Sequence, residues 1–220
     1  MPAGPVGVVD GAEDGEVSSA EARPWGVSLS YAEFAGSLRF DGSLDMKVRQ
    51  RLLSARLRYA FAQRWYVAAA LGATLGGSLQ GEERRLEFNP GVVATLQSGV
   101  LLLEAHEARP FIEATLNLSV SHARLKEGEG VSAPWTAFDA RLGLTIGWHV
   151  ASFWVPYAAF RVFGGPALWT DGALLRTGSD RHHVQVALGS TFRVMGLNLF
   201  AEWAPPVGES GVAAGVAYAF

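Results

Sequence analysis

The sequence predicts an all-β chain, folded as an antiparallel up-and-down transmembrane β-barrel of about ten strands. Apolar side chains alternate with small or polar ones along most of the chain, which is the pattern of strands with two unlike faces. The longest apolar stretch, residues 65–75, has 11 residues, whereas a membrane helix needs about 20. Tight turns are expected about every 44 residues, a repeat that favours a meander with short turns at one end and longer loops at the other.

The first half of the chain is expected to form four strands, beginning at Trp25. Each has leucine, valine or aromatic residues on one face and small residues on the other. The polar segment after the first strand either is irregular or contains strand extensions around Leu38 and Phe40. In the fourth strand, the alternation blurs after Gly99, which indicates a β-bulge. The expected strands are 25–31, 53–61, 65–76 and 88–103, with a polar segment at 35–47, a loop at 77–85 and a turn at 62–64.

The second half alternates more cleanly. Leu142, Leu144 and Ile146 share one face of a strand, and Arg141 and Thr145 lie on the other. An even number of strands puts both termini at the short-turn end. The expected strands are 112–121, 138–150, 157–162, 184–193, 197–203 and 211–220, with turns at 106–109, near 152 and at 195–196, and loops at 126–134, 164–180 and 205–210.

The closing strand has one apolar face and one face of glycine and alanine, and the chain stops on an aromatic residue. Val216, Tyr218 and Phe220 lie on the apolar face. This ending resembles the last strand of small bacterial outer-membrane β-barrel proteins. The resemblance is architectural and covers residues 25–220. It implies a bacterial outer-membrane location, contact with outer-membrane lipids and lipopolysaccharide, and recognition of Tyr218 and Phe220 by the outer-membrane assembly machinery.

The composition of the two faces indicates which one meets lipid. The less apolar face is mostly Gly, Ala, Ser and Thr, and the chain has only two lysines, whereas the solvent face of a soluble barrel would contain many charges. Small residues suit the interior of a narrow barrel. Aromatic residues near both strand ends match the girdles at membrane interfaces. The expected girdle is Trp25, Tyr59, Trp65, Trp135, Trp148, Trp154, Trp169 and Trp203.

Composition excludes several other kinds of site. The formal net charge of −3 gives no basic nucleic-acid surface, and the absence of cysteine excludes disulfides and thiolate metal sites. No cofactor or metal is predicted. Residues 1–23 are rich in Gly, Pro and acidic residues and are expected to be a disordered periplasmic tail, with the barrel over 24–220. No signal peptide is visible, so a mature form is expected.

Eight charged residues fall on the small-residue face and are expected to line the lumen. Charges in a confined interior must pair or stay hydrated. A salt-bridge ladder that plugs the barrel is the favoured interpretation. The alternative is a narrow pore with anion preference, because five arginines face three acids and a ring of positive side chains selects anions. The network is Arg56, Arg58, Glu113, Asp139, Arg141, Arg161, Arg193 and Glu202.

Enzymatic candidates are weaker. His122 faces lipid, where barrel phospholipases and lipid A deacylases place a His and Ser pair, but its outward neighbour is Arg124 and the nearby serines point inward. Asp180 and the His182-His183 pair lie at the rim, where omptin-like proteases place Asp and His pairs, without a second acidic pair. No catalytic residue is therefore predicted.

The sequence favours a non-enzymatic structural or scaffolding barrel that anchors an envelope complex, with other envelope proteins as partners. The alternatives are a narrow pore for ions or small solutes and, third, an outer-membrane lipid hydrolase. The loops are modest in length and mixed in charge, which suits a partner contact better than a deep active site.

Overall fold

The computed structural model describes residues 24–82, 84–105, 109–126, 132–206 and 209–220. The expected tail at residues 1–23 lies outside them. Among the described residues, no helix is long and apolar enough to cross a membrane, a finding that says nothing about a β-barrel. The strands are β1 (Trp25–Phe40), β2 (Leu44–Ala62), β3 (Trp65–Gln80), β4 (Arg85–Phe88), β5 (Gly91–Leu103), β6 (Phe111–Lys126), β7 (Ala133–Gly147), β8 (Trp154–Gly164), β9 (Pro166–Asp171), β10 (Leu174–Asp180), β11 (Val184–Val194), β12 (Leu197–Ala204) and β13 (Ser210–Ala219).

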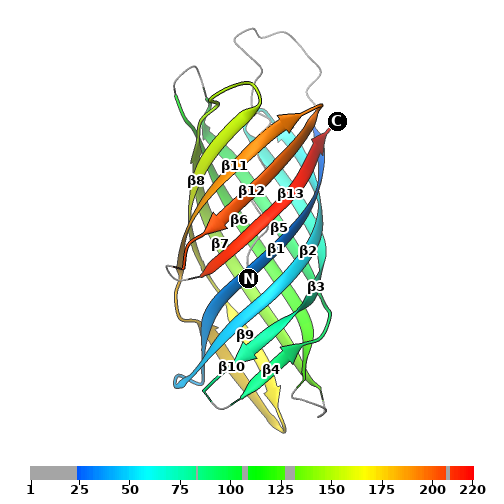
Figure 1. The fold of residues 1–220 in the computed structure, drawn as a ribbon, viewed down its shortest axis with the longest axis vertical. Helices are drawn as coiled ribbons and strands as arrows, with labels where there is room; N and C mark the ends of the chain where they lie inside the picture. The colour runs from blue at the N-terminus through cyan, green and yellow to red at the C-terminus, as the bar shows by residue number, and fades with distance from the viewer. Residues whose placement is uncertain (1–23, 83, 106–108, 127–131, 207–208) are drawn as a thin grey trace.

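These segments form a closed antiparallel barrel (Figure 1). Three strands of the barrel are interrupted by a short break, so that each appears as two segments: β4 and β5, β8 and β9, and β10 and β11. The first strand pairs with the last over ten residue pairs, from Gly26 with Ala219 to Ala35 with Ser210. The all-β class, the antiparallel meander and the expected strand number are therefore confirmed. A register shift between Leu101 and Leu103 gives the blurred alternation after Gly99 a structural cause.

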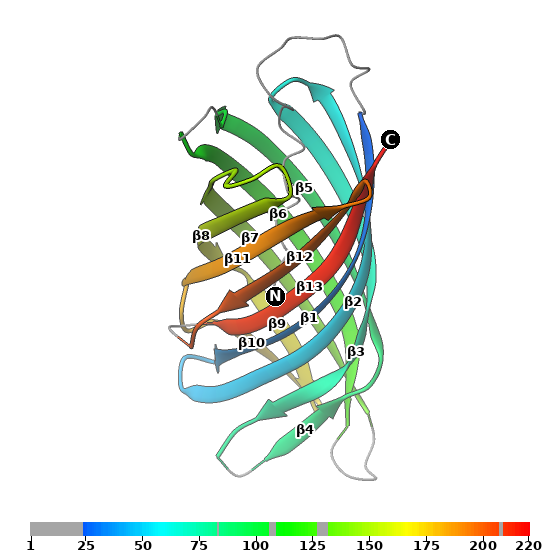
Figure 2. The same cartoon turned by 45° about the horizontal axis from the view of Figure 1, so that its top comes forward.

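The barrel changes strand number along its axis. Around the half that contains Trp25 and Phe220, the ring runs β1, β2, β3, β5, β6, β7, β8, β11, β12 and β13. The β12–β13 hairpin is short, and beyond its tip β10 pairs directly with β1, from Leu38 with Asp180 to Phe40 with Gly178. The ring there runs β1, β2, β3, β4, β6, β7, β9 and β10. Ten strands thus become eight (Figures 1 and 2).

In the ten-stranded half, the outer surface is apolar and the inside is polar. Leu29, Leu57, Leu71, Leu118 and Leu142 are all exposed on the outer wall. Most inward positions of the same strands are glycine, alanine, small hydroxyl residues and buried charges, with a few buried aromatic residues such as Tyr66 and Phe111. This is the arrangement of a barrel whose outer wall faces hydrocarbon.

In the eight-stranded half, the polarity is reversed. The outward series of β1 changes from apolar at Tyr31 to charged at Glu33, and that of β2 changes between Leu53 and Arg51. Tyr31 is paired with Leu53 and Glu33 with Arg51, so the change occurs at one height. The paired strands β6 and β7 change at the same step, from Val120 and Phe138 to His122 and Thr136. The inward series changes the opposite way, for example from Ser30 through Ala32 to Phe34 in β1.

Two loop predictions are wrong in extent, because the segments at 77–85 and 164–180 contain the end of β3 and all of β9 and β10. The strand extensions left open in the polar segment 35–47 are present as the ends of β1 and β2. They alternate as strands do, but with polar residues outward, because this part of the wall lies beyond the apolar band and its outer face meets water. The loop expected at 126–134 is shortened by β7, which begins at Ala133, and its residues 127–131 lie outside the described residues.

Candidate functional site

The predicted lumenal charges lie on the inner wall, and several meet where the ten-stranded ring narrows. Arg161 of β8 donates two hydrogen bonds to Glu202 of β12, from Nη1 to Oε1 at 2.7 Å and from Nη2 to Oε2 at 2.6 Å. Its Nη1 also donates to Gln185 Oε1 of β11 at 3.0 Å, and Tyr157 Oη donates to Glu202 Oε2 at 3.3 Å. All four side chains are buried. Two planar groups held in this fork geometry form a strong ion pair.

Arg141 of β7 forms the second part of this network. Its Nη2 donates to Glu209 Oε2 at 3.0 Å, its Nε lies 3.4 Å from Asp139 Oδ2, and its guanidinium carbon lies 4.5 Å from the centre of the Phe163 ring. Glu209 precedes β13 at the tip of the short hairpin and is buried. Glu209 was not among the predicted lumenal charges because residues 205–210 were expected as a loop, whereas its carboxylate is buried against Arg141.

A third group lies on the opposite wall, on β2, β3, β5 and β6. Tyr66 Oη donates to Glu113 Oε1 at 2.5 Å and accepts a hydrogen bond from Gln97 Nε2 at 3.0 Å. The guanidinium carbon of Arg58 lies 4.4 Å from the centre of the Tyr66 ring. The structure therefore brings together Arg56, Arg58 and Glu113 around Tyr66 on one wall, and Asp139, Arg141, Arg161 and Glu202 on the other. Arg56 and Arg193 are half-buried on the inward faces of β2 and β11.

An apolar cluster fills the inside of the eight-stranded half. The Phe40 ring lies edge-on to Trp135 and Trp169, with ring centres 6.1 and 5.8 Å apart, and Phe88 lies edge-on to Trp135 at 5.3 Å. We call this set the apolar plug. It consists of Phe34, Leu38, Phe40, Met46, Val48, Leu52, Leu79, Leu86, Phe88, Val93, Ala123, Leu125, Trp135, Ala137, Ala167 and Trp169.

The plug corrects two positions of the expected aromatic girdle. Trp135 and Trp169 are each 2% exposed and point into the barrel. Both lie in the eight-stranded half, where the apolar face of each strand points inward. Their side chains therefore belong to the core. The other expected girdle residues lie on the outer wall with exposed rings: Trp25, Tyr59, Trp65, Trp148, Trp154 and Trp203. Tyr218 and Phe220 are also exposed on that wall, at the end of β13.

The enzymatic candidates do not assemble into a catalytic group among the described residues. His122 is exposed, and its Nδ1 lies 3.0 Å from Thr136 Oγ1, but Ser119 and Ser121 point inward. His183 Nδ1 lies 3.1 Å from the backbone oxygen of Phe163. No group of three His, Cys, Asp or Glu residues able to hold a metal occurs in the described part of the chain.

Ion pairs link the strand ends at the eight-stranded rim. Asp45 of β2 accepts hydrogen bonds from Arg39 Nε at 2.7 Å and from Arg181 Nη1 at 2.9 Å. The hydrogen bond from Arg39 lowers the pKa of Asp45. Asp171 of β9 accepts hydrogen bonds from Arg176 Nε and Arg84 Nη1, both at 3.0 Å. Burial alone would raise the pKa of Asp171, but these two hydrogen bonds outweigh it and hold the pKa below its ordinary value.

Acid is expected to loosen this rim. A carboxylate whose pKa is lowered in the folded protein stabilises the fold fully above the ordinary aspartate pKa of about 3.9, and this stabilisation is lost as the pH falls through the lower folded-state pKa. Amide hydrogen exchange over residues 171–176, corrected for its intrinsic pH dependence, should therefore accelerate below about pH 4. The step should be missing in Asp171→Asn. An identical acid step in wild type and variant would show that Asp171 is not responsible.

The chain resembles known proteins in structure but not in sequence. Neither a protein-family model nor a curated protein sequence matches the chain. The outer membrane protease OmpT from Escherichia coli is similar over 90% of this chain and 97% of its own, with 12% identity and a TM-score of 0.58. The translocator domain of the autotransporter NalP from Neisseria meningitidis is similar over 92% and 90%, with 12% identity and a TM-score of 0.52. The transport unit of the autotransporter AIDA-I from Escherichia coli is similar over 92% of each chain, with 9% identity and a TM-score of 0.50.

These likenesses show the fold and leave the activity open, because barrels of one architecture host unrelated functions. An apolar outer band on this fold places the protein in a bacterial outer membrane. The chain thus has the fold of the bacterial outer-membrane β-barrel proteins.

Proposed function

We propose that the protein is a non-conducting, non-enzymatic structural barrel of the outer membrane, which holds a rigid eight-stranded extension beyond the lipid as a scaffold for other envelope components. The observation that supports this most directly is the apolar plug. Eight strands leave an interior just wide enough for side chains to fill. Here, large aromatic rings from β1, β4, β7 and β9 meet across that interior.

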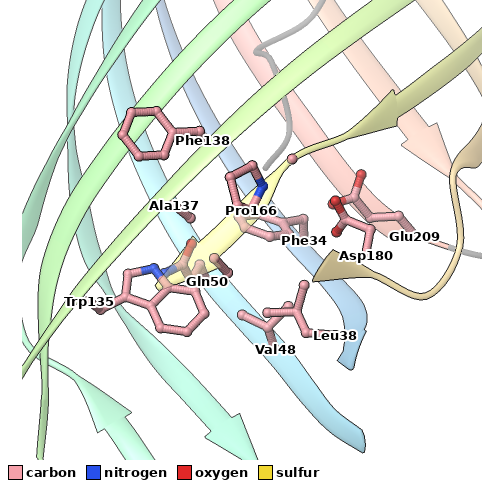
Figure 3. Close-up of a pocket in the computed structure, with 12 residues that line it drawn as sticks. Phe34, Leu38, Val48, Gln50, Trp135, Ala137, Phe138, Pro166, Asp180 and Glu209 are labelled. Carbon is pink, nitrogen blue, oxygen red and sulfur yellow. The ribbon is translucent and has the colours of Figure 1, made fainter. Parts of the chain in front are cut away.

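The space left beside the plug is small. A cavity of about 30 Å³ lies between the plug and the charge network, among Phe34, Gln50, Trp135, Asp180 and Glu209 (Figure 3). Such a cavity holds a water molecule or two. A cavity of this size does not hold an ion with its hydration shell, which supports the plugged scaffold over the anion-preferring pore. The buried charge pairs of the ten-stranded half then stabilise the inner wall and do not select ions.

Planar-bilayer recording tests this proposal. The wild-type protein should give no steady single-channel current, because ions cannot cross the plug without dehydration. The double variant Phe40→Ala/Trp135→Ala removes two facing rings and should produce frequent current steps. Its folding can be checked by the resistance of the folded barrel to unfolding by detergent at room temperature. Steady, anion-selective channels from the wild-type protein would support the pore instead.

A further inference from the structure

The outer wall of the eight-stranded half contains a cluster of six cations, only some of which pair with carboxylates of the barrel. Lys47, Arg49 and Arg51 are successive outward positions of β2. Arg85 of β4 and two residues of β6 continue the cluster across the wall. We call this set the basic wall. It consists of Lys47, Arg49, Arg51, Arg85, Arg124 and Lys126, all exposed except the half-buried Lys126.

The strand registers place these residues side by side. Lys47 is paired with Gln80, which is paired with Arg85, and Glu87 is paired with Lys126. At this height, β2 and β6 are separated only by β3 and β4. The backbones at Arg51 and Arg124 are therefore three strand spacings apart, or about 14 Å. A Cβ atom added at Gly76 of β3 would lie 3.5 Å from Arg51 Nη2. The Arg51 guanidinium therefore extends over β3, toward β4 and β6.

Nearby carboxylates balance only part of the positive charge of the basic wall. The whole chain has a formal charge of −3, yet both of its lysines lie here. Arg49 forms an ion pair with Glu33, and Arg85 Nη2 lies 3.8 Å from Glu87 Oε1. Within the described part of the chain, Lys47, Arg51, Arg124 and Lys126 form no ion pair with a carboxylate. Four cations are thus directed outward.

The height of the basic wall indicates what it meets. Toward the membrane, the outward positions become apolar: Leu53 is the next outward residue after Arg51 on β2, and on β6 Val120 follows His122, four residues from Arg124. The outer surface changes here from hydrocarbon-facing to polar, so this is the level of lipid headgroups. A ligand that spans this boundary needs acyl chains for the wall below and anionic groups for the cations above. Arginine binds phosphate through two parallel hydrogen bonds, which a planar guanidinium matches well.

We propose that the basic wall is a binding site for a phosphorylated glycolipid of the outer leaflet, with Arg51 and Arg124 contacting two phosphates at opposite ends of one disaccharide headgroup. The acyl chains of that lipid lie against the apolar residues of β2, β3, β5 and β6. Lys47 and Lys126, farther from the membrane, contact the more distant anionic groups of the same headgroup. The lipid would thereby fix the depth and the rotation of the barrel in the membrane.

Binding of bis-phosphorylated lipid A to the detergent-purified full chain tests the proposal. The variant Arg51→Gln/Arg124→Gln should weaken this binding by about tenfold or more, because each arginine contributes a charge-assisted hydrogen bond to phosphate. The matched control is Arg39→Gln/Arg181→Gln. It removes the same charge from exposed rim residues that pair with Asp45, and lipid A binding should stay unchanged.

Three further measurements separate a lipid site from a general anion site. Monophosphoryl lipid A should bind the wild-type protein more weakly than the bis-phosphorylated form, and the difference should shrink in Arg51→Gln. Inorganic phosphate at equal concentration should not compete. Equal lipid A affinity in wild type and the folded double variant would overturn the proposal. So would a double variant that keeps lipid A binding and loses only binding to a soluble polyanion such as heparin.

Discussion

Replacing Arg161 with alanine is expected to lower the free energy of unfolding by about 3–5 kcal/mol, because it leaves the buried carboxylate of Glu202 without its partner. Arg161 and Glu202 have side-chain exposures of 5% and 7%, so water replaces the lost guanidinium poorly. Urea unfolding of the barrel in lipid vesicles, followed by tryptophan fluorescence, measures this loss.

Two controls identify the cause. The double variant Arg161→Met/Glu202→Gln removes both charges and keeps most of the volume, so it should recover much of the lost stability. Arg49→Ala breaks an exposed ion pair with Glu33 and should cost about 1 kcal/mol or less. If the double variant is as unstable as Arg161→Ala, the loss comes from packing against Tyr157 and Gln185, and the ion-pair explanation fails.

Much of the fold could be predicted from the alternation of side chains along each strand. Once Leu142, Leu144 and Ile146 are assigned to one face, the opposite face contains Arg141, and the same reasoning gives the inward positions of Arg161 and Glu202. A period of two is a local property, so it can be recognised without knowing which strands pair. The alternation also continues without a change of phase through Phe34, Leu38 and Phe40.

The reversal of polarity was not predicted, because parity identifies a face and does not say which solvent that face meets. If one face is taken to stay apolar and lipid-facing along the whole strand, charged outward positions such as those in 77–85 and 164–180 are expected as loops. Each strand nevertheless contains the signal. In β2, the outward series runs Lys47, Arg49, Arg51 and then Leu53. A change from charged to apolar at one face, matched by the opposite change at the other face, marks the point where a strand leaves the membrane.

Other features depend on pairing between distant segments. The contact of β10 with β1 joins residues about 140 positions apart, and it follows from the short β12–β13 hairpin. Glu209 reaches Arg141 for the same reason, since the hairpin tip lies within the wall. Trp135 and Trp169 were placed in the girdle because they lie near strand ends, and only the ring of eight strands shows that those ends surround a core.

Replacing Phe40 with alanine is expected to lower the free energy of unfolding by about 3–5 kcal/mol, the typical cost of removing a large aromatic side chain from a packed core. Phe40 is fully buried and contacts both Trp135 and Trp169. The matched control is Phe138→Ala. Phe138 faces outward at 47% exposure, just inside the apolar band, where lipid chains can fill the space left by the ring.

The two variants distinguish the reversed barrel from a conventional one. In a barrel with a wet lumen throughout, Phe40 would be solvated and its removal would cost little. In the structure described above, its removal leaves a cavity in the plug, so Phe40→Ala should be the more damaging variant. Hydrogen exchange should then accelerate at the ends of β1, β2, β9 and β10 and stay unchanged in β12 and β13. Equal stability losses in the two variants would mean that the eight-stranded half has no core, and the closed lumen would lose its physical basis.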